Sequence, residues 1–76
     1  MENTTKRLFE GAQYGDRYRT RNGRRALFLK TWGKPATEAV LHVEGLGLEN
    51  FSLEGRRFEH REDPFDITVK CGNNER

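Results

Sequence analysis

Tyr18-Arg-Thr-Arg-Asn-Gly-Arg-Arg-Ala-Leu-Phe-Leu-Lys-Thr-Trp32 is the stretch that decides the fold. The pair Asn22-Gly23 stands in it between two segments rich in β-branched, aromatic and aliphatic residues. Both residues of the pair tolerate the positive φ that a two-residue type I′ turn requires, and the twist of this turn matches that of the flanking strands. The stretch therefore predicts a β-hairpin.

The first arm of this hairpin has one face for the core and one for solvent. Side chains of a strand alternate between its two faces, which places Tyr18 and Thr20 toward the core. The opposite face carries Arg17, Arg19 and Arg21. The second arm, residues 26–32, has apolar side chains on both faces, and so does the next apolar run, residues 39–44.

Two apolar faces on one strand require two covering layers. A chain of 76 residues has few elements that could provide them, and it buries only about 60–65% of the surface that its unfolded form exposes. The pattern therefore predicts self-association, as a homodimer whose interface includes Phe28, Trp32 and Val40.

Turn signals divide the rest of the chain into further strands. Residues 49–59 predict a second hairpin with Gly55 in its turn, while the two glycines of residues 45–48 predict a bend that curls the sheet. Pro64 cannot donate to a ladder, so the last strand, residues 65–71, begins after it.

We therefore expect one domain, residues 1–76, with frayed ends at residues 1–7 and 72–76. Five or six short strands with turns about ten residues apart predict an all-β fold, either a small antiparallel five- to six-stranded barrel or a strongly twisted sheet, of the SH3-like size class. The expected core consists of Tyr18, Leu27, Leu29, Leu41, Val43, Phe51, Ile67 and Val69.

Composition narrows the location of the protein. Cys71 is the one cysteine, which excludes an intramolecular disulfide framework and favours a reducing compartment, by default the cytoplasm. No apolar run approaches the roughly 18 residues of a membrane span. We therefore expect a cytoplasmic protein without a membrane partner.

Positive charge concentrates in the first half of the chain. Residues 1–35 hold nine Lys or Arg against three Asp or Glu, a net charge of +6, whereas residues 36–76 have a net charge of −4. Guanidinium groups on alternate strand positions match phosphate oxygens, but a charged face also keeps an exposed strand from pairing with other chains. The candidate binding residues are Arg17, Arg19, Arg21, Arg24, Arg25 and Lys34.

Residues for catalysis or metal binding are few. His42, His60 and Cys71 lie far apart in sequence and lack the spacing of a nucleophile motif or a ligand set. The carboxylates around Pro64 are interpreted as a solvated turn, with arginines 56, 57 and 61 as possible partners. We therefore expect no enzyme activity, no cofactor and no metal.

Three segments together suggest a relationship. They are Gly15-Asp-Arg-Tyr18-Arg-Thr20-Arg21-Asn-Gly23-Arg24-Arg-Ala26, then Leu53-Glu-Gly55-Arg56, and finally Phe65-Asp66-Ile67. This pattern, over roughly residues 8–69, resembles small uncharacterised β-rich proteins of phages and mobile elements in gut bacteria. The resemblance implies a compact β domain of phage or mobile-element origin and no assigned activity.

The leading functional hypothesis is a non-enzymatic binding module that acts on a host or phage protein. The alternative is a nucleic-acid-binding β domain that uses the arginine-rich hairpin, residues 17–25. The salt dependence of the affinity distinguishes the two hypotheses. Binding to phosphates releases counterions, so affinity for nucleic acid falls steeply with rising salt, whereas the affinity of an apolar protein contact changes much less.

Overall fold

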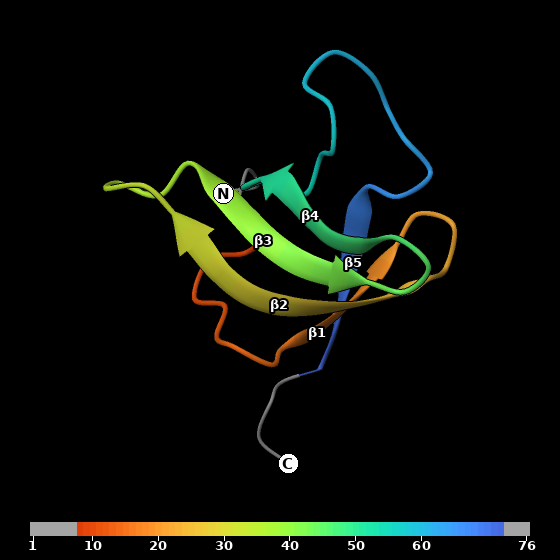
Figure 1. The fold of residues 1–76 in the computed structure, drawn as a ribbon, viewed down its shortest axis with the longest axis horizontal. Helices are drawn as coiled ribbons and strands as arrows, with labels where there is room; N and C mark the ends of the chain where they lie inside the picture. Colours follow the sequence, from red (N-terminus) through yellow and green to blue (C-terminus); the bar gives the residue numbers. More distant parts are fainter. Residues whose placement is uncertain (1–7, 73–76) are drawn as a thin grey trace, which may run out of the picture.

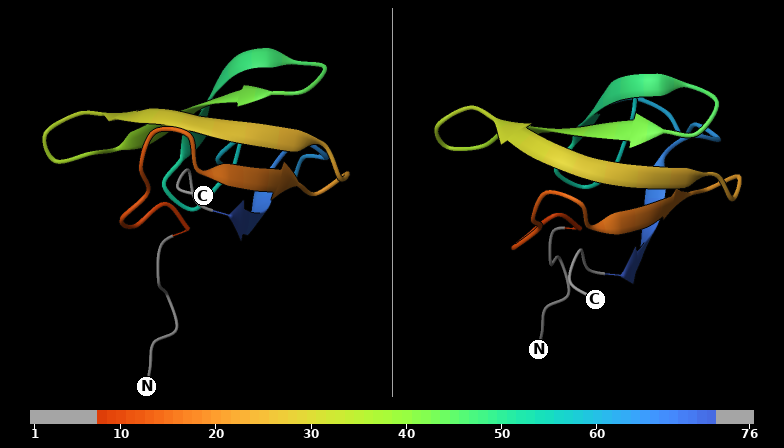
Figure 2. Two further views of the ribbon diagram at one scale, coloured as in Figure 1. Left: turned by 90° about the horizontal axis from the view of Figure 1, so that it is seen from below. Right: turned by 60° about the horizontal axis from the view of Figure 1, so that its bottom comes forward.

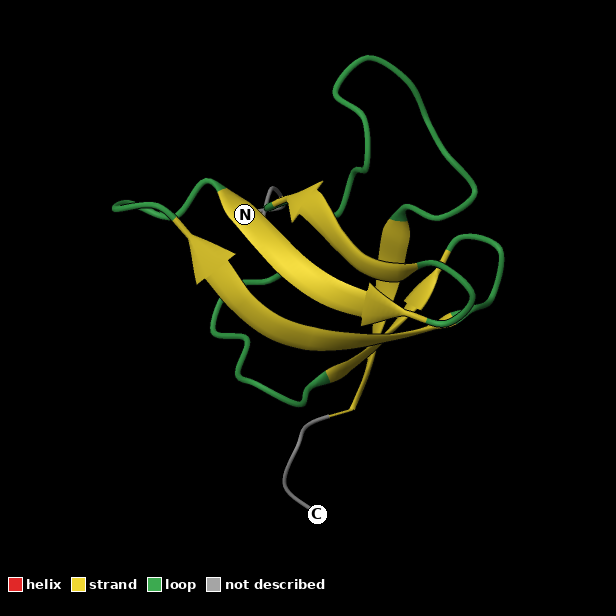
Figure 3. Cartoon of the chain, in the orientation of Figure 1, coloured by secondary structure: helices red, strands yellow, loops and turns green. Residues whose placement is uncertain are grey.

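The computed structural model describes residues 8–72, which form a single antiparallel β-sheet (Figure 1). Its five strands are β1 (Arg17–Thr20), β2 (Arg25–Trp32), β3 (Glu38–Val43), β4 (Gly47–Ser52) and β5 (Ile67–Gly72). This part of the chain has no helix (Figure 3), and hence none with the length and apolar character that a membrane crossing requires. The predicted all-β antiparallel fold is confirmed. Of the ends predicted to fray, residues 1–7 and 73–76 lie outside the described residues, whereas residue 72 ends β5.

The strand order is β4-β3-β2-β1-β5. β1 to β4 form a meander, and β5 returns to pair with the free side of β1. The sheet is strongly curved (Figure 2), and the amide of Ile67 at the start of β5 donates to the carbonyl of Gly55 at 2.7 Å. Within residues 8–72 no ladder joins β4 to β5, so the described strands form an open twisted sheet and not a closed barrel.

One face of the sheet packs on the core. Phe9, from the segment before β1, covers this face, and its ring meets that of Tyr18 edge-on with 5.1 Å between centroids. The predicted core positions Tyr18, Leu41, Val43, Phe51 and Ile67 are buried. The predictions for Leu27, Leu29 and Val69 are wrong, because these residues lie outside the core, whereas Ala26, Phe28 and Ala39 belong to it.

The turn of the first hairpin explains why Leu27 lies outside the core. It is not the predicted two-residue type I′ turn but a three-residue loop, in which Gly23 has a φ of 89° and its amide donates to the carbonyl three residues earlier at 3.0 Å. The extra loop residue places Tyr18 opposite Ala26 instead of Leu27. A shift of one residue exchanges the faces of a strand, so Ala26 and Phe28 face the core and Leu27 faces outward.

A bulge in β2 then places Phe28 and Trp32, both predicted at the homodimer interface, on opposite faces of the sheet. β2 pairs regularly with β3 up to Phe28 and again from Lys30 onward, which leaves Leu29 as an extra residue. The inserted residue changes the alternation, so Lys30 and Trp32 lie on the face opposite to Phe28. Phe28 is 3% exposed and belongs to the core, which corrects its prediction as an interface residue.

β4 ends in a turn of the same kind as that of the first hairpin. The amide of Gly55 donates to the carbonyl of Ser52 at 2.9 Å, and the hydroxyl of Ser52 accepts from the amide of Arg56 at 3.1 Å. In the first turn, the hydroxyl of Thr20 accepts from the amide of Arg24 at 2.8 Å. The sequences Thr-x-x-Gly-Arg and Ser-x-x-Gly-Arg thus form equivalent turns. The glycines of residues 45–48, predicted to bend the sheet, lie at the turn between β3 and β4.

The predicted strand over residues 56–59 does not form. After the second turn the chain enters a loop, and within the described residues its isolated bridge joins Phe58 to Arg61. The amide of Arg57 donates to the Asp66 carboxylate at 2.8 Å, which directs the backbone toward β5 instead of along β4. The second hairpin therefore has a turn but no second strand.

Asp66 holds this loop together. Its carboxylate, 1% exposed, accepts hydrogen bonds from the amide of Arg57 at 2.8 Å, the amide of Asp63 at 3.0 Å and the guanidinium of Arg21 at 3.2 Å. Burial raises the pKa of Asp66, but these hydrogen bonds outweigh burial and lower the pKa below its ordinary value of 3.8. The interpretation of the acidic cluster as a solvated turn is therefore wrong for Asp66, a buried structural carboxylate.

Candidate binding face

We call the side of the sheet that turns away from the core the outer face, and it divides into two halves. The arginine half consists of Arg17, Arg19, Arg25, Leu27, His42 and Glu44. The apolar half consists of Leu29, Lys30, Trp32, Glu38, Val40 and Leu48. Within residues 8–72, the segment that contributes Phe9 to the core does not line either half.

A row of four side chains crosses the middle of the outer face. Arg17 lies opposite Leu27, Leu27 lies opposite His42, and His42 lies opposite Leu48. The Cβ atoms of directly opposite residues are about 4.5–5.5 Å apart, so the row is continuous. Leu27 is 37% and Leu48 is 64% exposed. The row therefore joins a guanidinium to aliphatic surface across four strands.

The arginine half surrounds an open hollow of about 610 Å³. Arg19 and Arg25 lie directly opposite each other on neighbouring strands. Within residues 8–72 no carboxylate forms an ion pair with Arg17, Arg19 or Arg25. Glu44 accepts from the backbone amide of Arg25 at 3.2 Å, and the guanidinium of Arg19 donates to the carbonyl of Gly23 at 3.0 Å. Three guanidinium groups are thus gathered without an ion pair to any carboxylate of residues 8–72.

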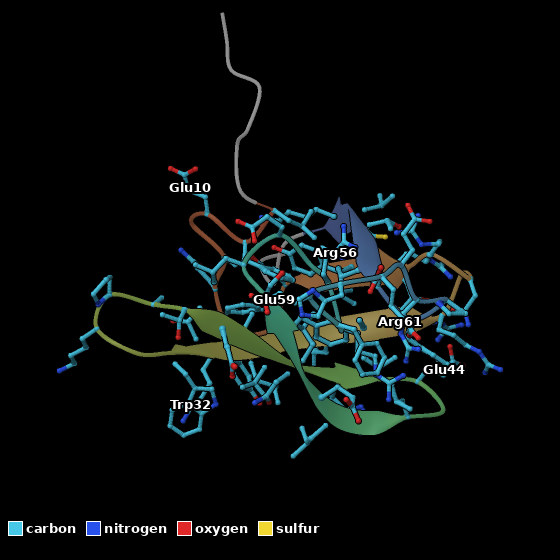
Figure 4. All side chains as sticks on the ribbon, turned by 90° about the horizontal axis from the view of Figure 1, so that it is seen from above. Glu10, Trp32, Glu44, Arg56, Glu59 and Arg61 are labelled. Atoms are coloured by element: carbon cyan, nitrogen blue, oxygen red, sulfur yellow. The ribbon has the colours of Figure 1, made fainter. Side chains whose placement is uncertain are left out.

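The apolar half is centred on Trp32. This side chain is 50% exposed, and Figure 4 shows it on the side of the sheet opposite to Glu10. The ammonium group of Lys30 lies 3.7 Å from the centroid of the indole ring, a cation–π contact that holds the ring against the sheet. Val40, predicted at an interface, is half-buried here between β2 and β4.

The remaining predicted binding residues lie elsewhere. Arg21 points away from the outer face and pairs with the buried carboxylate of Asp66. The guanidinium of Arg24 lies beside Gly45, which belongs to the turn between β3 and β4. Lys34 is exposed in the loop between β2 and β3, at the end of β2 far from the first turn (Figure 1). The structure therefore brings together Arg17, Arg19 and Arg25 but not the other three.

The candidate nucleophile and bases do not form a catalytic arrangement in the described chain. His42 on β3 and Cys71 on β5 line the same hollow, but β2 and β1 separate them by about three strand spacings of 4.8 Å. His60 is exposed, with its Nε2 3.9 Å from a carboxylate oxygen of Glu59. Nowhere in residues 8–72 do three or more His, Cys, Asp or Glu side chains gather as a metal ion requires.

Comparison with protein families, with curated proteins and with solved structures finds no match to this chain. Sequence analysis missed Leu27 and Leu48 as outer-face residues. A three-residue loop at Gly23 places Tyr18 opposite Ala26, and the alternation of β2 then puts Leu27 on the outer face.

Proposed function

We propose that this chain is a non-enzymatic protein-binding module whose binding surface is the outer face. One observation carries the proposal: Leu27, Trp32 and Leu48 expose much of their apolar surface on one side of a small sheet. Contiguous exposed apolar surface rimmed by polar groups is characteristic of interaction sites. Tryptophan and arginine, both present on this face, are the residues most enriched among those that dominate binding energy.

Nucleic-acid binding is the second candidate, and it is favoured by the guanidinium groups of Arg17, Arg19 and Arg25, which form no ion pair within residues 8–72. The outer face offers less to a nucleic acid than to a protein. Its one exposed aromatic ring, Trp32, lies under Lys30 and at the far end from the arginines, whereas single-strand binders use successive stacking platforms.

The finer classification of the fold and its origin are proposals as well. The return of the last strand to the first supports membership of the SH3-like class of small barrels. A phage or mobile-element origin is supported by the sequence resemblance, and a cytoplasmic location by the single cysteine.

Self-association through the apolar half is the first expected result of this proposal. At hundreds of micromolar, sedimentation should show about twice the chain mass of 8.9 kDa. Leu48→Glu should restore the monomer, because it places a charge in the apolar contact. Tyr14→Glu is the matched control, since Tyr14 is 68% exposed and lines neither half of the outer face. A wild-type monomer at these concentrations would remove the homodimer.

Capture of a protein from a lysate of gut bacteria, with and without nuclease treatment, tests the proposed function. We expect immobilised wild type and Tyr14→Glu to retain the same protein and Leu27→Glu to lose it, because Leu27 links the two halves of the outer face. Captured proteins that do not distinguish the three baits, or that disappear with nuclease, would contradict the proposal.

A further inference from the structure

We propose that the arginine half recognises an extended acidic segment of the protein partner. Carboxylates at alternate positions of that segment pair with Arg17, Arg19 and Arg25, and an aliphatic side chain between them contacts Leu27. This inference rests on the proposed function and specifies the chemistry of the partner.

The arrangement of the three guanidinium groups favours the binding of an anion. Like charges directly opposite each other on neighbouring strands destabilise a sheet, and Arg19 and Arg25 occupy such a pair. Arg17 adds a third positive charge two residues from Arg19 on the same face. No carboxylate in residues 8–72 forms an ion pair with any of them. A bound anion would remove the repulsion that the free protein bears.

The spacing fits an extended peptide. Residues two apart in a strand repeat at about 6.7 Å, which is the separation of the Arg17 and Arg19 positions along β1. An extended chain that runs along β1 presents its own alternate side chains at the same interval. Its carboxylates can therefore meet both guanidinium groups in register, with bidentate geometry available to each.

The surroundings of the hollow favour a peptide over its competitors. Leu27 lies opposite Arg17 and offers an aliphatic contact that a phosphate backbone does not use. A second copy docked through this half would bring its own arginines toward those of the first. An acidic segment with interspersed aliphatic residues satisfies both features.

Titration with synthetic peptides tests the inference. The probe is a fluorescently labelled peptide of about eight residues with alternating Glu and Val, and the reference peptide has Gln in place of Glu. We expect wild type to bind the Glu peptide and Arg17→Gln/Arg19→Gln to bind it about tenfold more weakly, because the variant loses two exposed ion pairs that each contribute modestly. Lys34→Gln/Arg61→Gln removes two positive charges outside the outer face and should bind as wild type does.

Four results would overturn the inference. They are equal binding of the Gln and Glu peptides, equal weakening by the two double variants, no binding of the Glu peptide up to about 1 mM, and tighter binding of a single- or double-stranded oligonucleotide than of the Glu peptide. If any of these occurs while capture from lysate still depends on Leu27, the proposed function stands without the acidic partner. If the Leu27 dependence is also absent, both proposals fail.

Discussion

Replacement of Asp66 with asparagine is expected to lower the free energy of unfolding by about 3 kcal/mol or more. Hydrogen bonds to a charged group contribute about 1.5–3 kcal/mol each, and a buried donor left without a partner costs about 1–3 kcal/mol. Asparagine keeps the shape of the side chain but has one acceptor oxygen for the Arg57 amide, the Asp63 amide and the Arg21 guanidinium. A domain of this size has a total stability of only roughly 4–11 kcal/mol, so urea denaturation should show a large shift of the midpoint.

The control for this substitution is Glu62→Gln, which removes a carboxylate from the same loop at an exposed position. It should change the free energy of unfolding by no more than about 0.5 kcal/mol. If Asp66→Asn proves as mild as Glu62→Gln, the loop is not held by the carboxylate and our account of the lost second hairpin strand is wrong.

The pH dependence of the free energy of unfolding shows whether Asp66→Asn acts through the lost charge or through a change of shape. Because the pKa of Asp66 is lower in the folded state than in the unfolded chain, its stabilising effect is fully present above about pH 4 and is lost as pH falls through the folded-state pKa. The difference in free energy of unfolding between wild type and Asp66→Asn should therefore be constant from about pH 7 to 5 and shrink below pH 4. A difference that does not shrink in acid would show that the variant acts through its shape.

The strands of this protein could be predicted from the sequence, but the face of β2 that packs on the core could not. Period-two alternation identified four of the five strands to within about two residues, and the Asn22-Gly23 pair identified the first turn. The sequence Thr-Arg-Asn-Gly-Arg is compatible with loops of two and of three residues, and the two loops place opposite faces of β2 on the core. The error at Leu27 follows from that single choice, and the bulge at Leu29 has no turn signal of its own.

The binding face was predictable only in part for the same reason. The alternation of β1 correctly placed Arg17 and Arg19 on the face opposite to Tyr18. Whether Arg21 joins them depends on Asp66, which lies 45 residues away in sequence. No local pattern reports such a contact. The sequence predicts a solvated turn at Asp66 because a β domain of 76 residues seldom encloses a pocket. Its burial arises from the packing of β5 beside β1.

The substitution Gly55→Ala is expected to cost more than about 3 kcal/mol, whereas Gly23→Ala should cost about 1–2 kcal/mol. Each glycine closes its own three-residue turn, and the two turns are of the same kind. The φ values of Gly55 and Gly23 are 92° and 89°, so the strain of placing a Cβ in this left-handed conformation is equal. A Cβ on Gly23 has nothing within 4 Å. A Cβ on Gly55 would overlap the backbone carbonyl oxygen of Ile67 and lie 2.8 Å from Cδ2 of Leu8.

The difference between the two variants therefore measures the packing of the second turn against β5 and not the turn itself. The added Cβ meets both the carbonyl oxygen and the carbonyl carbon of Ile67, the carbon at 3.3 Å. Neither atom can move without disturbing the amide of the same residue, which donates to the carbonyl of Gly55 at 2.7 Å. The displacement would also shift the adjacent Asp66, so we expect the hydrogen bonds of its carboxylate to be lost together with the turn. Thermal or urea denaturation of the pair tests this. Equal destabilisation by Gly23→Ala and Gly55→Ala would mean that the second turn does not contact β5 in solution, and that the two edges of the sheet do not approach each other there.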